Sequence, residues 1–221
     1  MSDVTSQAAD ILRLLDLASV VVFAITGALV ASRKQMDIVG FLWMGVVTGV
    51  GGGTLRDLLL DAPVFWVVDP TPLALCLCAA AFVHFSAHLV ASRYRFLLYL
   101  DAFGMALVTT VGTAKALEMG ADALVAVGMG VVTAAVGGIL RDILGQEPSI
   151  LLRRDIYVTA AVFGSITYVM ADAAGMPGTW TTAVAIGAGF GLRACAIRFD
   201  LFLPIFRPRP GRMPGHRGEV K

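Results

Sequence analysis

Residues Met44–Pro63 read MGVVTGVGGGTLRDLLLDAP, and 85 positions later Met129–Pro148 read MGVVTAAVGGILRDILGQEP. Twelve of these twenty aligned positions are identical without a gap, where ordinary residue usage would give about one or two. At the same offset Asp16 falls on Asp101. The chain therefore carries an internal repeat, and each copy places consecutive glycines and an Arg-Asp pair inside an apolar run.

Both copies lie in a chain that is too apolar for a soluble domain. Of its 221 residues, 57% are hydrophobic and 15% are charged, against about 45–50% and about 25% in soluble domains. Seven apolar segments approach the roughly 20 residues that a membrane-spanning helix needs. They are separated by turn residues and charges, and cover 15–32, 38–59, 71–91, 97–117, 122–144, 154–172 and 179–199. We predict an all-α membrane protein with seven transmembrane helices.

Each copy of the repeat contains three of these segments, which has a consequence for topology. Because three is odd, the second copy must enter the membrane in the opposite direction from the first. We therefore expect a 3+3 inverted repeat plus one helix, an arrangement in which transporters place their pathway at the repeat interface. The predicted divisions are an N-terminal segment 1–14, a first repeat 15–91, a second repeat 97–172, a seventh helix 179–200 and a basic disordered tail 207–221.

The basic residues predict an orientation. The N-terminus and the loops on its side contribute only Arg13 and Lys115. The opposite side contributes the basic tail together with Arg33, Lys34, Arg93, Arg95, Arg153, Arg154 and Arg198. The positive-inside rule then places the C-terminus in the cytoplasm and the N-terminus outside. We expect a multi-pass protein of a bacterial inner membrane.

The consecutive glycines, Gly51, Gly52 and Gly53 and later Gly137 and Gly138, admit two interpretations. Each glycine costs about 1 kcal/mol relative to alanine in a helix interior, so a run of them predicts a kink or an unwound turn. At membrane depth such backbone must be buried in protein or line a watery cavity. Alternatively, close helix packing explains small residues spaced by four, here Gly45, Gly49 and Gly53, and Gly130, Ala134 and Gly138. We favour a kink beside a pathway, because Gly51 and Gly52 lie off that stripe.

The charge pairs Arg56–Asp57 and Arg141–Asp142 have two candidate roles. A charged residue at the bilayer centre costs at least about 2.5–3.5 kcal/mol, so such residues usually face a partner or a water-filled pathway. The pairs could be structural, perhaps crossed between the two copies, or could act directly on passing ions, and both roles can hold together. Thr48 and Thr133 lie one turn before the glycines. Their hydroxyls could face a hydrated ion or bond back to their own helices.

Two further features have a simpler interpretation. Lys115 and Glu118 could form a charged mouth, but a solvated helix end is the more common arrangement. The stretch GGGTLRDLLL resembles the GG-x-x-RD loop of tRNA nucleotidyltransferases, which also need a metal-binding Asp-x-Asp soon afterwards, and none follows here. Two copies inside apolar segments make that match coincidental. We predict no enzymatic activity, no metal, no cofactor and no nucleic-acid partner.

The paired motifs, GGG-x-x-RD in the second segment and GG-x-x-RD in the fifth, resemble the bacterial branch of the TRIC family over residues from about 12 to 200. These are trimeric intracellular cation channels, and the bacterial sequences are also described as a glycine-transporter-like domain family. The resemblance implies a homotrimer with an hourglass pore in each subunit and kinks at the glycines. It also implies passage of monovalent cations, chiefly potassium, with sodium. The Lys-Glu-Val triplet that animal members use for lipid binding and gating does not occur in this sequence.

Two other classes of function use the same features. A secondary carrier for a small zwitterion such as glycine would bind its carboxylate at half-helix N-termini and its ammonium at freed carbonyls. A non-transporting membrane scaffold would leave the repeated glycines explained only by packing. Unitary currents distinguish the channel, and saturation with counterflow distinguishes the carrier.

Overall fold

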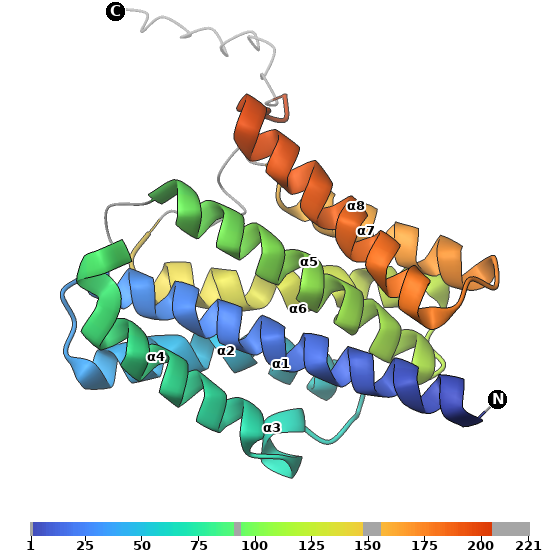
Figure 1. Ribbon diagram of the computed structural model, residues 1–221, viewed down its shortest axis with the longest axis horizontal. Helices are drawn as coiled ribbons and strands as arrows, with labels where there is room; N and C mark the ends of the chain where they lie inside the picture. The colour runs from blue at the N-terminus through green and yellow to red at the C-terminus, as the bar shows by residue number, and fades with distance from the viewer. Residues whose placement is uncertain (1, 91–93, 148–155, 205–221) are drawn as a thin grey trace, which may run out of the picture.

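Seven long helices and one short one make up the described part of the chain. The computed structural model describes residues 2–90, 94–147 and 156–204. The long helices are α1 (Ser2–Arg33), α2 (Ile38–Leu59), α4 (Thr71–Val90), α5 (Tyr94–Glu118), α6 (Ala123–Leu144), α7 (Val158–Ala173) and α8 (Gly178–Phe199), and α3 (Phe65–Val68) is a single turn. The predicted all-α class is confirmed, and each predicted apolar segment forms one long helix (Figure 1).

The ends of two predicted segments differ from the structure. Helix α1 begins at Ser2, so helix continues through most of the segment 1–14 that we separated from the first span. Helix α7 begins at Val158, and positions 154 and 155 of the predicted segment lie outside the described residues. The predicted basic tail 207–221 lies outside the described residues.

Among the described residues, four helices have the length and hydropathy to cross a membrane. They are the Asp10–Arg33 part of α1, and α2, α6 and α8. Large apolar side chains point outward from the bundle, and Phe85 and Leu124 are 74% and 83% exposed, whereas Arg56 and Asp57 are fully buried. A hydrocarbon solvent favours this distribution, in which apolar side chains lie outside and charges lie inside.

The two copies of the repeat begin and end their helices at equivalent positions. Helix α6 has the bounds of α2 shifted by 85 residues. After each of these helices the chain turns through a residue in the left-handed region, Asp61 with φ 52° and Gln146 with φ 51°. The equivalent residues Gln35 and Gly120 also have positive φ. Equal local sequence therefore produces equal local structure in both halves.

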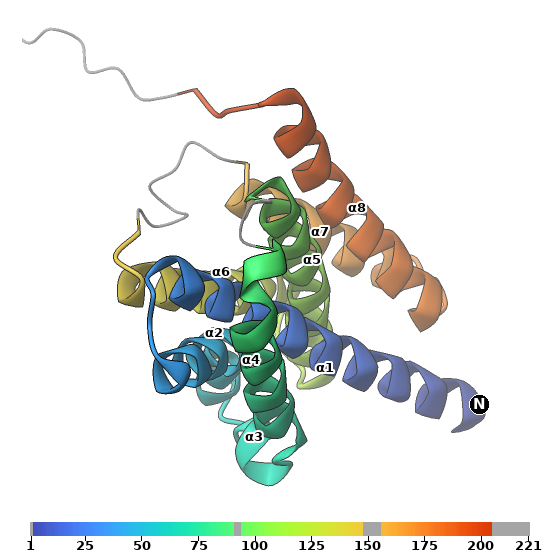
Figure 2. The same ribbon diagram turned by 60° about the vertical axis from the view of Figure 1, so that its left-hand side comes forward.

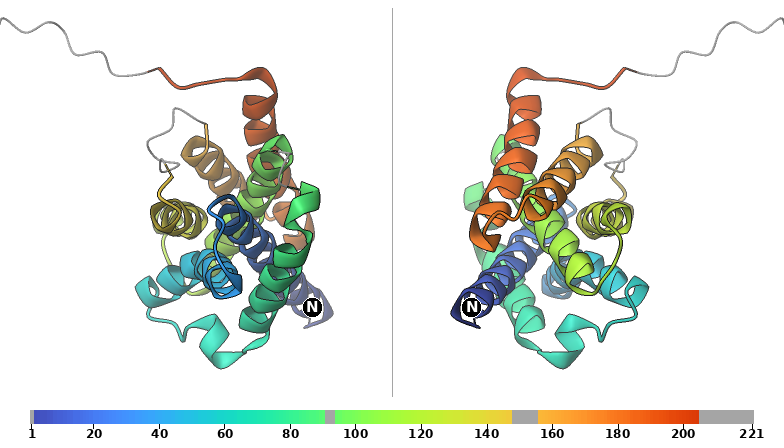
Figure 3. Two further views of the ribbon diagram at one scale, coloured as in Figure 1. Left: turned by 90° about the vertical axis from the view of Figure 1, so that its left-hand side faces the viewer. Right: turned by 90° about the vertical axis from the view of Figure 1, so that its right-hand side faces the viewer.

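Helix α1 lies in the middle of the bundle and packs against α2, α4 and α5, while α2 also packs against α6. Helices α7 and α8 pack together and against α5. Figure 2 and the end-on views of Figure 3 place α7 and α8 on one side of the bundle and α3 on the opposite side. The sequence repeat thus brings α2 and α6, its two glycine-bearing helices, into direct contact.

Candidate functional site

Helices α2 and α6 cross at their glycines, where backbone meets backbone. A Cβ atom added to Gly137 would lie 2.6 Å from the carbonyl oxygen of Thr48, and one added to Gly52 would overlap the carbonyl oxygen of Thr133. Because the repeat pairs Thr48 with Thr133 and Gly52 with Gly137, the contact is reciprocal. Only glycine allows two helix backbones to approach this closely.

The unwound turn that we predicted at the glycines does not occur in either helix. Helices α2 and α6 are helical from their first to their last residue. Packing accounts for Gly52 although it lies off the stripe of small residues. Gly51 and Gly53 also face neighbours, since an added Cβ would lie 2.7 Å from a Leu140 methyl and from the Phe65 ring respectively. Gly138 is buried within α6. The position of Gly51 and Gly52 off the stripe therefore does not by itself indicate a pathway.

The two threonines bond back to their own helices. Thr48 Oγ1 donates to the carbonyl oxygen of Met44 at 2.6 Å, and Thr133 Oγ1 donates to that of Met129 at 2.5 Å. Both side chains are buried at the crossing, with 1% exposure each. Each hydroxyl is thus bonded within its own helix, so the back-bonded alternative is the one that the structure has.

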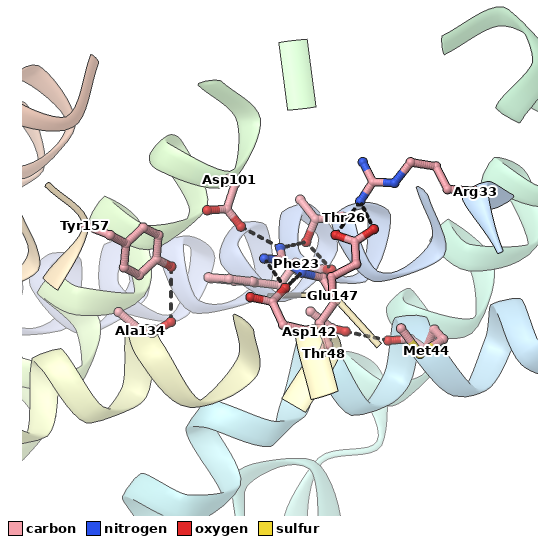
Figure 4. Close-up of polar contacts among 11 residues, drawn as sticks. Phe23, Thr26, Arg33, Met44, Thr48, Asp101, Ala134, Asp142, Glu147 and Tyr157 are labelled. Atoms are coloured by element: carbon pink, nitrogen blue, oxygen red, sulfur yellow. Dashed lines mark hydrogen bonds and ion pairs between the residues drawn. The ribbon is translucent and has the colours of Figure 1, made fainter. Parts of the chain in front are cut away.

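Arg141 forms one charged cluster, with Thr26, Asp101 and Asp142. Its Nη1 donates to Asp101 Oδ1 at 2.7 Å and to Thr26 Oγ1 at 3.2 Å. Its Nε and Nη2 donate to Asp142 Oδ1 at 3.1 and 3.0 Å. Thr26 in turn donates to the carbonyl oxygen of Phe23 at 2.9 Å, as Figure 4 shows. We call this set the Arg141 cluster, and it joins α1, α5 and α6.

Arg56 forms a second cluster, with Asp16, Asp57 and Lys115. Asp57 Oδ1 accepts from Arg56 Nε at 2.8 Å and from Lys115 Nζ at 2.7 Å. Asp57 Oδ2 accepts from the backbone N–H of Phe65 at 2.9 Å. Asp16 Oδ1 lies 3.7 Å from Arg56 Nη1. This Arg56 cluster joins α1, α2 and α5, and its two carboxylates balance its two cations.

The clusters cross between the two copies of the repeat, as the structural interpretation of the pairs expects. Lys115 of the second copy binds Asp57 of the first, and Arg141 of the second copy binds Thr26 of the first. In both clusters each buried arginine lies beside carboxylates, and paired charges cost far less than unpaired ones in a low-dielectric interior. Holding the copies together is therefore one function of both clusters.

Sequence reasoning placed neither Asp16, Thr26 and Asp101 nor Lys115 in a charged cluster. Asp16 and Asp101 align in the repeat, which was a usable signal for paired charges in both copies. Lys115 was assigned to a solvated helix end, but its side chain is 28% exposed and its ammonium binds Asp57. No local pattern indicates that bond, because the two residues are 58 positions apart.

A cavity of about 510 Å³ adjoins the Arg56 cluster. Its charged lining residues are Asp16 and Lys115 together with the ion pair of Arg13 and Asp69, whose N–O distance is 2.9 Å. Hydrogen bonds from the side chain and backbone of Thr71, with Arg13 nearby, lower the pKa of Asp69 below its ordinary value. The cavity therefore presents charges of both signs to a hydrated ion or a zwitterion.

A family model and two bacterial membrane proteins are similar to this chain over most of its length. A family model described as "Glycine transporter" matches residues 13–88 and 98–173. The inner membrane protein YadS of Escherichia coli (strain K12) is 40% identical over 202 residues, covering 87% of this chain and 94% of YadS. A membrane protein of Vibrio cholerae is 36% identical over 201 residues, covering 89% of this chain and 83% of that protein.

Two solved structures identify the family. A TRIC trimeric intracellular cation channel orthologue from Rhodobacter sphaeroides is 49% identical, with a TM-score of 0.84, covering 86% of this chain and 99% of that one. Another TRIC cation channel structure is 30% identical, with a TM-score of 0.80, covering 90% of this chain and 98% of that one. The chain belongs to the TRIC family.

Proposed function

We propose that this protein is a homotrimeric channel for monovalent cations, potassium and also sodium, with one pore in each subunit. The observation that carries the proposal is the reciprocal contact of Gly52 and Gly137 between the two charged clusters. TRIC cation channels share the fold at 49% and 30% identity, which supports the class of function. The equivalent bounds of α2 and α6 support the seven-span inverted repeat.

The proposed pore passes through the crossing of α2 and α6. In the present conformation the two helices touch there, so this conformation is closed. Separation of the helices would expose the carbonyl oxygens of Thr48 and Thr133, which face the partner helix across the glycines. Carbonyl oxygens can replace part of the hydration shell of potassium. The Arg56 and Arg141 clusters hold the helix ends and shape the electrostatic potential on either side of the crossing.

The proposed setting is a bacterial inner membrane, with the N-terminus outside and the C-terminus in the cytoplasm. Relatives such as YadS are inner membrane proteins, and the asymmetry of basic residues supports this orientation. A carrier for a small zwitterion is the second candidate. The description of the family model favours it, as does a cavity with both Asp16 and Lys115 in its wall.

Planar-bilayer recording of the purified protein in asymmetric KCl tests the channel directly. We expect discrete currents that reverse toward the potassium equilibrium potential. Gly52→Leu and Gly137→Leu should abolish them, because a side chain at either position meets backbone of the opposite helix. Gly128→Leu is the matched control, since no atom lies within 4 Å of a Cβ added there. Size-exclusion chromatography checks that every variant still assembles.

The opposite outcome is equally specific. A silent bilayer, together with counterflow of labelled glycine in liposomes from the same preparation, would reject the channel and support the carrier.

A further inference from the structure

Asp16 and Asp101 are equivalent in the repeat but differ in their contacts. Asp101 Oδ1 accepts a hydrogen bond from Arg141 at 2.7 Å, and its side chain is 8% exposed. Asp16 Oδ1 lies 3.7 Å from Arg56, beyond hydrogen-bond distance, and its side chain is 21% exposed. The repeat therefore supplies one carboxylate that is hydrogen-bonded to its arginine and one that forms only a longer ion pair with it.

The difference has a cause in the surrounding residues. Thr26 accepts a hydrogen bond from Arg141, whereas the equivalent position next to Arg56 is Val111, whose side chain cannot accept one. Lys115 binds Asp57 Oδ1, and the position equivalent to Lys115 in the first copy is the apolar Val30. Because Arg56 shares Asp57 with Lys115 and position 111 offers no hydroxyl, the Arg56 guanidinium is incompletely bonded.

The incomplete bonding is visible at the guanidinium. Arg56 is fully buried, yet its Nη1 and Nη2 have no hydrogen-bond partner among the described residues. Buried donors are normally satisfied by protein or by ordered water, and leaving them unmade is costly. Because the neighbouring Asp16, Phe65 and Lys115 line the 510 Å³ cavity, we infer that water reaches Arg56 from this cavity.

Asp16 also lines a neighbouring cavity of about 240 Å³, which shares Arg13 and Lys115 with the first. The charged groups that share these cavities with Asp16 are Arg13, Asp69, Lys115 and Glu118. Arg13 is bonded to Asp69, and Lys115 to Asp57. Of the two aspartates that the repeat pairs with an arginine, Asp16 is thus the one accessible to an incoming ion.

We propose that Asp16 is a weak binding site for the permeant monovalent cation in the cavity beside the Arg56 cluster. This proposal rests on the proposed channel function and assigns a residue to it. Arg56 and Lys115 lie close enough to weaken the attraction of Asp16 for a cation, and an ion must bind weakly enough to leave if it is to be conducted. Asp101 is a structural residue, because Arg141 occupies its carboxylate.

The test is the single-channel conductance of Asp16→Asn compared with wild type in dilute and in concentrated KCl. We expect a several-fold loss in dilute KCl and a much smaller loss in concentrated KCl, because salt screens the charge that recruits cations. Asp122→Asn is the matched control. It removes a carboxylate at the start of α6 that makes no capping hydrogen bond, and its conductance should equal that of wild type.

A cysteine variant separates charge from size. In a background with the exposed Cys78 and Cys195 changed to alanine, Asp16→Cys should regain conductance in dilute KCl after modification by an anionic sulfonate reagent. A neutral reagent of similar size should leave it low. Thermal unfolding adds a second readout, in which Asp101→Asn lowers the melting temperature more than Asp16→Asn does.

Each outcome has one meaning. Cation currents of wild type with Asp16→Asn unchanged at both salt concentrations would overturn the role of Asp16 and leave the channel intact. Failure of Asp16→Asn to assemble would also overturn it, because Asp16 would then be a structural residue like Asp101. Absence of current in the wild-type protein would instead reject the proposed function itself.

Discussion

At the scale of the residue, glycine has different effects at different positions of one helix. Gly137 faces the carbonyl oxygen of Thr48 across the crossing of α2 and α6, and that backbone atom cannot move aside as a flexible side chain can. Gly128 lies nine residues earlier on α6 and has no atom within 4 Å of a Cβ built on it. Packing therefore requires glycine at one position and not at the other.

We predict that Gly137→Ala destabilises the protein while Gly128→Ala does not. Overpacking of a tight contact typically costs about 1–3 kcal/mol, whereas alanine in an open helical position gains up to about 1 kcal/mol. The measurement is thermal unfolding of both variants in the same detergent. Equal melting temperatures for the two variants would contradict the backbone contact at the crossing.

At the scale of the element, an ion pair joins the end of α1 to the residues that follow α6. Arg33 Nη2 donates to both carboxylate oxygens of Glu147, at 2.9 and 3.1 Å (Figure 4). The side chains are 31% and 20% exposed, so solvent screens the pair only partly. The ion pair therefore adds a second link between α1 and the end of α6, which the Arg141 cluster also joins.

We predict that exchanging these charges reveals the contact. Arg33→Glu alone places two carboxylates together and should lower the melting temperature, and adding Glu147→Arg should recover most of the loss. A double-mutant cycle should give a coupling of about 0.2–1 kcal/mol, the usual range for pairs that solvent still reaches. If the double variant is no more stable than Arg33→Glu, the ion pair does not stabilise the protein.

At the scale of the whole molecule, the proposed odd number of spans determines where the ends of the chain lie. An inverted repeat of three spans per copy followed by α8 places the two termini on opposite sides of the membrane. The excess of arginine and lysine on one side supports the proposal that the C-terminus lies in the cytoplasm.

Labelling from outside the cell tests this topology. We predict that Ser2→Cys reacts in intact spheroplasts with a maleimide that cannot cross the membrane, in the background lacking Cys78 and Cys195. A cysteine added after Lys221 should react only after the membrane is permeabilised. Reaction of both positions from the same side would require an even number of spans and would contradict the seven-span arrangement.

Several features of this protein could be predicted from composition and from the repeat alone. Apolar length identified the seven long helices, and the shift of 85 residues identified α2 and α6 as equivalent. The sequence also predicted that Arg56–Asp57 and Arg141–Asp142 need partners, because unpaired charge is costly away from water. The helices and the need for partners depend on residues that are near one another in the chain, and the equivalence of α2 and α6 depends only on comparing two stretches of sequence.

Which residues meet could be seen only in the folded protein. The glycines suggested an unwound turn, but Gly52 and Gly137 instead pack against backbone of the opposite helix, in helices that remain continuous. Asp101 is locked by Arg141 while Asp16 is not, although the two align in the repeat. The physical reason is that these contacts depend on how helices cross, and the crossing joins residues from 40 to 115 positions apart.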